Sequence, residues 1–248
     1  MKKFICLLII VIVAAIVGYK VYPMLNNQEN DVENAINTVE SEKADTKEDT
    51  EEKLSNETMY EEVISSYKNA YEELDLEDYE SEEKILAKYD MVSVTLIEHV
   101  KRYEDNDISL TYEFYDIDSN GIDELIVGAS GAPGAIYSLN KKDNKIVKVY
   151  YQDTMERGDL SIYDNGTIVS SGAGGAALHY YEFGKISEED SSYKLLEKIE
   201  EEYEMENEAP TYRDATSGKV LDYKSYDEIV DKYILDSEKV EFTNYKNI

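Results

Sequence analysis

Asp116, Asp118, Asn120 and Glu124 place oxygen-bearing side chains at alternate positions of one short stretch, with Gly121 among them. Calcium prefers six to eight oxygen ligands, supplied by carboxylates, amide oxygens, main-chain carbonyls and water. A chain that coils around such an ion turns every second residue inward. The glycine permits a sharp turn at a backbone angle that other residues resist. The spacing therefore predicts a calcium-binding loop.

The elements on either side of this loop are predicted to be strands. Residues 109–115 and 125–127 are rich in aromatic and β-branched side chains, which are typical of strands. The main-chain carbonyl of Ile122 completes the predicted ligand set. A helix–loop–helix calcium site would need a bidentate glutamate at the twelfth loop position, which is Val127 here. We therefore expect a strand–loop–strand hairpin and not an EF-hand.

An acidic hairpin turn without an ion is the alternative, because Asp, Asn and Gly are ordinary turn-forming residues. The crowding of negative charge argues against it. Asp116, Asp118, Asp123 and Glu124 lie within one short stretch, and such carboxylates repel each other unless a positive charge sits between them. We favour ion binding, and we expect the ion to have a structural rather than a catalytic role.

Residues 114–130, followed by 134–137, resemble an FG-GAP/VCBS repeat, the integrin-type calcium-loop hairpin. The resemblance implies that the first, third, fifth and ninth loop residues hold the ion; these are Asp116, Asp118, Asn120 and Glu124. The family usually has Asp at the ninth position, where this chain has Glu. Such repeats also come in sets of about seven that close a propeller, and this chain has one copy, over about residues 109–140. A complete propeller is therefore not expected.

The sequence is also similar to poorly characterised anchored proteins of anaerobic Gram-positive bacteria. In those proteins one such hairpin is followed by a second with an Asn-Gly turn and a Gly-Gly-Ala-Ala segment. The corresponding residues here are Asn165-Gly166 and 174–177. This resemblance implies no particular activity.

Composition limits the classes of partner. The chain has 55 acidic residues against 25 Lys and Arg, for a net charge of −30. Such a field repels phosphate backbones, so nucleic-acid binding is excluded, while cationic partners and divalent ions are favoured. With 23 Tyr and no Trp, tyrosine is expected to supply much of the aromatic core, and a carbohydrate-stacking surface is the alternative. Cys6 is the one cysteine, so no disulfide forms within the chain.

The N-terminus predicts export and attachment to the cell membrane. Lys2 and Lys3 precede an unbroken apolar run over residues 4–18, and Tyr19 and Tyr22 suit the membrane interface. Residues 1–23 are therefore predicted to be an uncleaved, single-pass signal anchor with the C-terminal bulk outside the cytoplasm. Cleavage after Ala15, which would release a secreted protein, is the alternative.

Residues 24–56 are polar and charged, with too few apolar side chains to fold, and are predicted to be a disordered acidic linker. Residues 57–248 are predicted to form one extracytoplasmic α+β domain, in which short helices pack on an antiparallel β meander. The helical periodicity covers three segments between residues 57 and 103 and a last helix around 226–233. Asp164-Asn165-Gly166 predicts a tight hairpin, and residues 240–242 are expected to form a closing strand.

Other candidate sites are less specific. The glycine-rich stretches 172–179 and 128–134 are most simply bent strands or bulges, and the alternative is a floor of small residues that binds a ligand. His99 and His179 are the two histidines, and no nucleophile motif accompanies them. We therefore predict a non-enzymatic domain that binds a protein or cell-surface ligand. A calcium-dependent cell-wall or surface hydrolase is the alternative.

Overall fold

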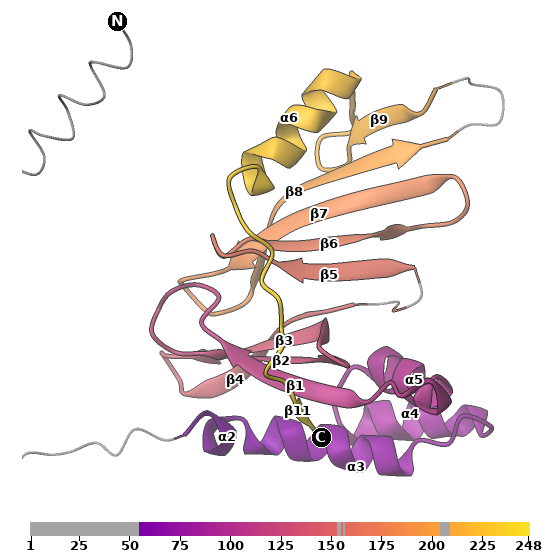
Figure 1. The fold of residues 1–248 in the computed structure, drawn as a ribbon, viewed down its shortest axis with the longest axis vertical. Helices are drawn as coiled ribbons and strands as arrows, with labels where there is room; N and C mark the ends of the chain where they lie inside the picture. Colours follow the sequence, from indigo (N-terminus) through magenta and orange to yellow (C-terminus); the bar gives the residue numbers. More distant parts are fainter. Residues whose placement is uncertain (1–54, 153–154, 156, 204–208) are drawn as a thin grey trace, which may run out of the picture. The chain divides into compact units, whose positions relative to one another are not determined.

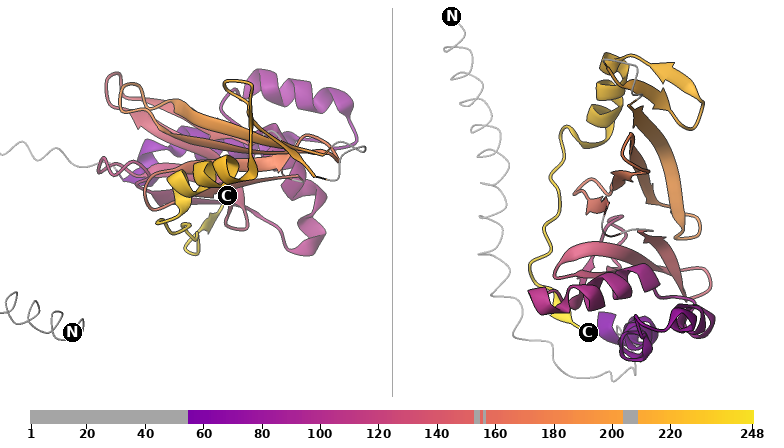
Figure 2. Two further views of the ribbon diagram at one scale, coloured as in Figure 1. Left: turned by 90° about the horizontal axis from the view of Figure 1, so that it is seen from above. Right: turned by 90° about the vertical axis from the view of Figure 1, so that its right-hand side faces the viewer.

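The computed structural model describes residues 55–152, 155, 157–203 and 209–248. Residues Lys53–Ile248 form one compact unit. Short helices and two antiparallel sheets build it (Figures 1 and 2), which confirms the predicted α+β class. The predicted signal anchor and nearly all of the predicted linker lie outside the described residues.

The N-terminal helices cover one face of the first sheet. They are α2 (Asn56–Met59), α3 (Glu61–Glu73), α4 (Tyr79–Lys88) and α5 (Val94–Arg102). The predicted apolar stripe of α3 is confirmed, since Val63 and Tyr67 are buried. In α4 the side chain of Ile85 is buried, whereas that of Leu86 is 50% exposed. In the described part of the chain, every helix falls short of what a membrane span requires.

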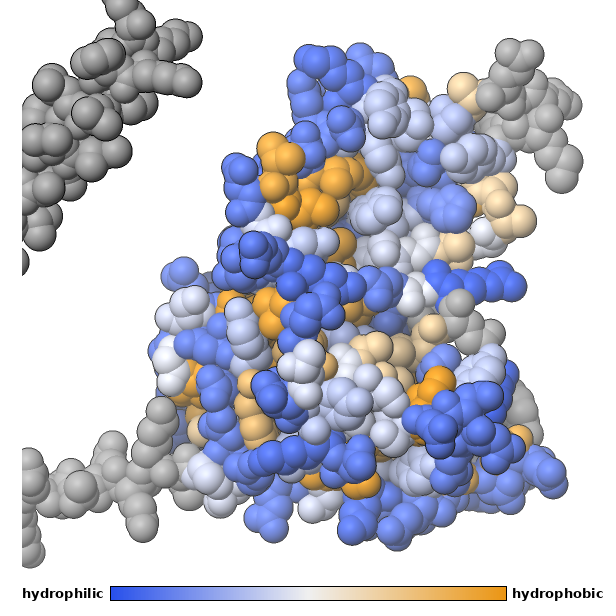
Figure 3. All heavy atoms as spheres, in the orientation of Figure 1, coloured by the Kyte–Doolittle hydropathy of each residue, from blue (hydrophilic) through white to orange (hydrophobic). Residues whose placement is uncertain are grey.

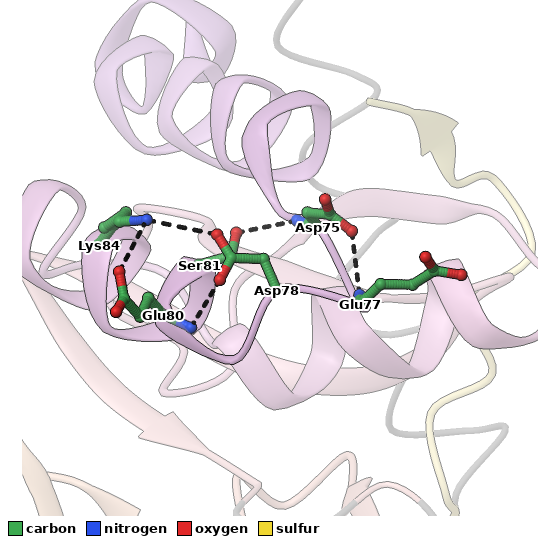
Figure 4. A network of polar contacts seen from close by, with 6 residues as sticks. All are labelled: Asp75, Glu77, Asp78, Glu80, Ser81 and Lys84. Carbon is green, nitrogen blue, oxygen red and sulfur yellow. Dashed lines mark hydrogen bonds and ion pairs between the residues drawn. The ribbon is translucent and has the colours of Figure 1, made fainter.

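The turn between α3 and α4 is held by local hydrogen bonds (Figure 4). Asp78 caps α4 by accepting the Glu80 N–H at 3.0 Å, and its other oxygen lies 3.3 Å from Lys84 Nζ. The Asp75 N–H donates to Ser81 Oγ at 2.9 Å. N-caps of this kind contribute about 1 kcal/mol each. Asp75 and Asp78 therefore lie in a turn whose hydrogen bonds start α4, which gives this acidic cluster a structural role.

The first sheet, sheet A, has the order β11-β1-β2-β3-β4. Its strands are β1 (Leu110–Tyr115), β2 (Glu124–Ala129), β3 (Ala132–Asn140), β4 (Lys145–Tyr151) and β11 (Lys246–Asn247). In the antiparallel β1–β2 pair, Tyr115 stands opposite Glu124. Leu125 and Val127 of β2 join the core under the helices, whereas Ile126 points to the other face. The sheet thus buries both faces.

The second sheet, sheet B, has the order β10-β9-β8-β7-β6-β5. Its strands are β5 (Gly158–Ile162), β6 (Ile168–Ala173), β7 (Leu178–Ile186), β8 (Tyr193–Glu202), β9 (Thr211–Asp214) and β10 (Lys219–Leu221). The predicted single meander is therefore divided in two after β4. A twisted sheet of this many strands gains more burial by splitting into two packed sheets than by continuing flat. The predicted last helix is confirmed as α6 (Tyr223–Ile234), which packs on sheet B (Figure 1).

The chain end differs from the prediction. Residues 240–242 do not form a closing strand: the Val240 N–H donates to the Ile162 carbonyl at 2.8 Å, and Phe242 is buried between the sheets. The closing strand is β11, which pairs with β1 on sheet A. Beside β5 this segment forms one isolated bridge, between Tyr163 and Lys239, before Phe242 enters the core between the sheets.

A second core lies where the sheets meet. Its buried members come from both sheets, from the segment between β1 and β2 and from the segment between α6 and β11, and they are Ile117, Ile126, Ile136, Val149, Leu160, Ile162, Ile168, Ile186 and Phe242. Hydrophilic residues cover most of the described part of the face shown in Figure 3. A hydrophobic patch lies over α6, whose neighbour Leu235 is 67% exposed.

Replacing Tyr67 by Phe is expected to lower the free energy of unfolding by about 1–3 kcal/mol, because a buried donor would lose its acceptor. The Tyr67 hydroxyl accepts the Ser93 N–H at 2.9 Å and bonds to the Tyr137 hydroxyl at 2.8 Å, and all of these atoms are buried. Urea unfolding followed by circular dichroism measures the change. The control Tyr245→Phe, at an exposed ring, should change stability by less than about 0.5 kcal/mol.

Candidate metal centre

The loop between β1 and β2 coils around its own acidic side chains. The two carboxylate oxygens of Asp116 accept the N–H groups of Asn120 at 3.0 Å and of Gly121 at 2.9 Å. Asp118 also accepts the Asn120 N–H, at 3.1 Å. Gly121 has a φ of 83° with open space where a Cβ would stand, so the backbone angle alone requires glycine here. The predicted sharp turn is confirmed.

Three of the predicted ligands meet at one point. Asp116, Asp118 and Glu124 each offer a carboxylate oxygen, and these atoms lie within 4.8 Å of one another. Asn120 lies in the same loop, where its Oδ1 accepts the Ile122 N–H at 3.0 Å. An amide oxygen has two lone pairs, so one stays available to an ion. The ligand roles of Asn120 and of the Ile122 carbonyl stay predictions.

Glu124 is fully buried, which is unusual for a carboxylate. Its two oxygens accept the Ile117 N–H at 2.8 Å and the Ser138 hydroxyl at 2.9 Å. Burial raises the pKa of Glu124 to about 7, helped by the charges of Asp118 and Asp116 and opposed by the two hydrogen bonds. At neutral pH this carboxylate therefore needs either a proton or a cation close by.

Sheet B supports the loop from one side. The Ile117 side chain is buried in the core between the sheets, so it fixes the segment between the two aspartates. At the predicted Asn165-Gly166 turn, a Cβ on Gly166 would stand 2.8 Å from the Ile117 carbonyl oxygen. Glycine at this turn thus allows the β5–β6 hairpin to approach the loop closely.

The helical layer supports the loop exit. Asp123 is not one of the three converging acids, and its carboxylate accepts a hydrogen bond from Asn56 Nδ2 at 2.6 Å. Its main-chain carbonyl accepts the buried Tyr60 hydroxyl at 2.9 Å. Asn56 was predicted to be the last residue of the linker. In the structure it is the first residue of α2, and it contacts the loop through Asp123. Asp123 has a structural partner and is not part of the converging set.

Several residues that contact the loop could not be identified from the sequence pattern. Ser138 reaches Glu124 because β3 pairs with β2, and Lys141 donates to the Asn120 carbonyl at 3.1 Å from the next turn. Asn56 lies 67 residues from its partner. Strand pairing and packing, not local spacing, bring these side chains to the loop.

The other candidate residues lie elsewhere. Gly172 belongs to β6 and residues 174–177 form the β6–β7 turn, while Gly128 lies at a bulge of β2. These stretches thus serve hairpins of different sheets, as the simpler prediction held. His99 lies on α5 with its ring 4.9 Å from that of Tyr103, and His179 is exposed on β7.

The donor chemistry suits a hard cation. The converging atoms are carboxylate oxygens, and calcium is the common biological cation that accepts six to eight oxygen ligands in a flexible loop. Carboxylates alone do not favour zinc or copper, which prefer imidazole and thiolate ligands. The residues present fit calcium.

Comparison of the chain with protein-family models, with curated proteins and with solved structures gives no match. The FG-GAP/VCBS resemblance therefore rests on the loop residues and stays a prediction.

The raised pKa of Glu124 predicts a pH dependence of stability in metal-free protein. The folded state holds the proton more tightly than the unfolded chain, so the free energy of unfolding should fall as pH rises from about 4.5 through about 7. The part due to Glu124 is on the order of 2–3 kcal/mol. Urea unfolding in chelator across this range measures it. Glu124→Gln should remove that part of the slope, and an unchanged slope in this variant would contradict the assignment.

Proposed function

We propose that this protein is a membrane-tethered, extracytoplasmic interaction domain whose fold is stabilised by one calcium ion in the loop between β1 and β2. The observation that carries the proposal is the convergence of Asp116, Asp118 and Glu124 within 4.8 Å, with Glu124 fully buried. Three carboxylates so close together repel one another, and a divalent cation removes that repulsion.

The ion has a structural role in this proposal. The loop joins two strands of sheet A, contacts the β5–β6 turn through Gly166 and contacts α2 through Asp123. An ion that fixes the loop therefore stabilises the junction of both sheets and the helical layer. In the absence of disulfides, such a brace suits a protein exposed outside the cell.

The proposed location outside the cytoplasm rests on the N-terminal sequence. The apolar run over residues 4–18 follows two lysines, which favours an anchor with the C-terminal domain outside. Calcium outside cells is abundant enough for a weak site, with a Kd of about 10⁻⁴–10⁻³ M. The proposed location and the proposed ion are thus mutually consistent. The hydrolase alternative stays a prediction.

Isothermal titration calorimetry of the full-length protein in detergent tests the ion site. We expect one calcium per chain with a Kd of about 10⁻⁴–10⁻³ M. Asp116→Asn combined with Asp118→Asn should abolish the binding heat. Asp143→Asn, in the exposed β3–β4 turn, is the matched control and should bind like the wild type. Equal loss in the control, or no calcium heat in the wild type, would contradict the proposal.

Protease treatment of intact cells tests the proposed location and membrane orientation of the domain. An extracytoplasmic domain should be degraded by protease added outside, and the cell should retain a membrane-embedded N-terminal fragment. Full protection of the domain until the cells are lysed would refute the proposed orientation.

A further inference from the structure

One face of sheet B carries a group of aromatic side chains around a single glutamate. His179, Glu201 and Tyr212 stand opposite one another across β7, β8 and β9, so their side chains share a face. Tyr203 follows on the same side, where its ring meets that of His179 at 6.1 Å. Tyr226 of α6 places its ring 4.6 Å from that of Tyr212. We call these five residues the Glu201 surface.

Glu201 is the charged centre of this surface. The Tyr203 hydroxyl donates to Glu201 Oε1 at 2.8 Å, and this bond raises the pKa of Tyr203. Burial, followed by the charge of Glu201, raises the pKa of both Tyr212 and Tyr226. Three tyrosines thus lie within the field of one carboxylate.

Elsewhere in this protein, a tyrosine bonded to a glutamate also holds a lysine. Tyr89 donates its hydroxyl to Glu73 at 2.9 Å. Lys88 pairs with the same carboxylate at 2.7 Å and lies over the Tyr89 ring, 5.0 Å from its centre. The ammonium group therefore has a carboxylate and an aromatic face as partners at once.

The same arrangement occurs on sheet B beside α6. Tyr233 donates its hydroxyl to Glu197 at 2.9 Å. Lys232 pairs with Glu197 at 3.0 Å and lies 4.5 Å from the centre of the Tyr233 ring. Two separate parts of the fold thus build a cation site from a glutamate and the tyrosine that bonds to it.

The Tyr203–Glu201 pair offers the same carboxylate and aromatic ring, but within the described residues no Lys or Arg pairs with them. Among the residues that the structure describes, no ion pair or cation–ring contact involves Glu201, Tyr203, Tyr212 or Tyr226. Arg213 is adjacent in sequence, but it stands opposite Glu200, on the other face of the sheet, and lies 3.9 Å from Glu202. Tyr203 is 47% exposed, so its ring is open to a partner.

We propose that the Glu201 surface binds a basic segment of a partner protein, with a Lys or Arg side chain on the Tyr203 ring and its charge against Glu201. This inference names the partner chemistry of the proposed interaction domain and to that extent rests on it. The surface is nevertheless built from residues other than those of the calcium loop. The net charge of −30 adds a long-range attraction for such a segment.

The hydrogen-bonding chemistry favours a peptide over a small quaternary ammonium ligand. Glu201 and the tyrosine hydroxyls are acceptors, which suit the N–H donors of Lys and Arg. A quaternary ammonium group has no N–H and is usually held inside a closed aromatic cage. Here the exposed Tyr203 ring lies beside Glu201 just past the end of β8, which suits an extended segment.

Calorimetric titration of the full-length protein in detergent with tetralysine at low salt tests the inference. Tyr203→Leu should weaken binding about two- to fivefold, because it removes the ring. Glu201→Gln should weaken it by up to about fivefold. Tyr203→Phe keeps the ring and frees Glu201 from its hydrogen bond, so it should bind at least as tightly as the wild type.

The controls separate this surface from general attraction to an acidic protein. Glu189→Gln and Tyr245→Leu remove an exposed acid and an exposed ring elsewhere and should change affinity by less than about twofold. Equal weakening in these controls, or no tetralysine binding, would overturn the inference, as would tighter binding of tetramethylammonium than of tetralysine. Calcium binding measured on the same samples tests the calcium site independently, so that failure of one proposal can be told from failure of the other.

Discussion

Replacing Glu124 by Ala is expected to lower the free energy of unfolding in about 2 mM calcium by about 3–5 kcal/mol. The buried Ile117 N–H and the buried Ser138 hydroxyl would lose their acceptor, and each orphaned group costs about 1–3 kcal/mol. The missing side-chain atoms also leave a cavity. Urea unfolding followed by far-ultraviolet circular dichroism measures the loss, and the absence of Trp makes this signal the practical one.

Glu124→Gln separates the hydrogen bonds from the charge. A glutamine has nearly the same shape, so its oxygen accepts the Ile117 N–H while its amide donates to the Ser138 hydroxyl. In chelator at about pH 7.5 this variant should be at least as stable as the wild type, because it buries no charge. In calcium it should lose the stabilisation by the ion, about 1–2 kcal/mol. If Glu124→Gln is as unstable as Glu124→Ala in chelator, the buried charge of Glu124 does not explain the instability of the metal-free protein.

Gly128→Ala is expected to destabilise the protein by at least about 3 kcal/mol, or to prevent folding. A Cβ at this position would stand 2.0 Å from the Ala132 carbonyl oxygen and 3.2 Å from Pro133 Cα. Both atoms belong to the backbone of β3, so the clash is relieved only by moving one strand. The bulge at Val127/Gly128 depends on this close approach. The change should be visible as a lower thermal midpoint and a lower soluble yield.

Gly218→Ala is the matched control for this effect. Gly218 has a φ of 71°, but a Cβ there would meet nothing within 4 Å. Its substitution should cost only the backbone strain, about 1 kcal/mol. If both alanine variants lose the same stability, the steric account of Gly128 is wrong.

The sequence predicted the parts of the fold that local patterns encode. The apolar stripe of α3, the Asn165-Gly166 turn and the two strands beside the candidate calcium loop follow from periodicity and turn chemistry, and they are present. The division into two sheets was not predictable in this way, because it depends on which faces bury each other. Strands β9 and β10 were missed since they are too short to show a clear alternating pattern.

The candidate site shows the same limit. The alternation of Asp116 and Asp118 with apolar or small residues predicted the converging acids, and the structure brings both together with Glu124. Burial of Glu124 comes from its position on β2 between two packed layers, which spacing does not reveal. Its partner Ser138 and the supporting Asn56 come from other elements. The acids of the loop could thus be predicted from the sequence, whereas the residues that surround them depend on tertiary structure.

Thermal unfolding of the full-length protein in detergent, in about 2 mM calcium and then in chelator, tests the central claim most directly. We predict that calcium raises the midpoint by about 3–6 °C, as expected for a stabilisation of about 1–2 kcal/mol in a domain of this size. The shift should vanish in the double variant Asp116→Ala/Asp118→Ala. An unchanged midpoint in the wild type, or an equal shift in the double variant, would contradict a calcium ion in this loop.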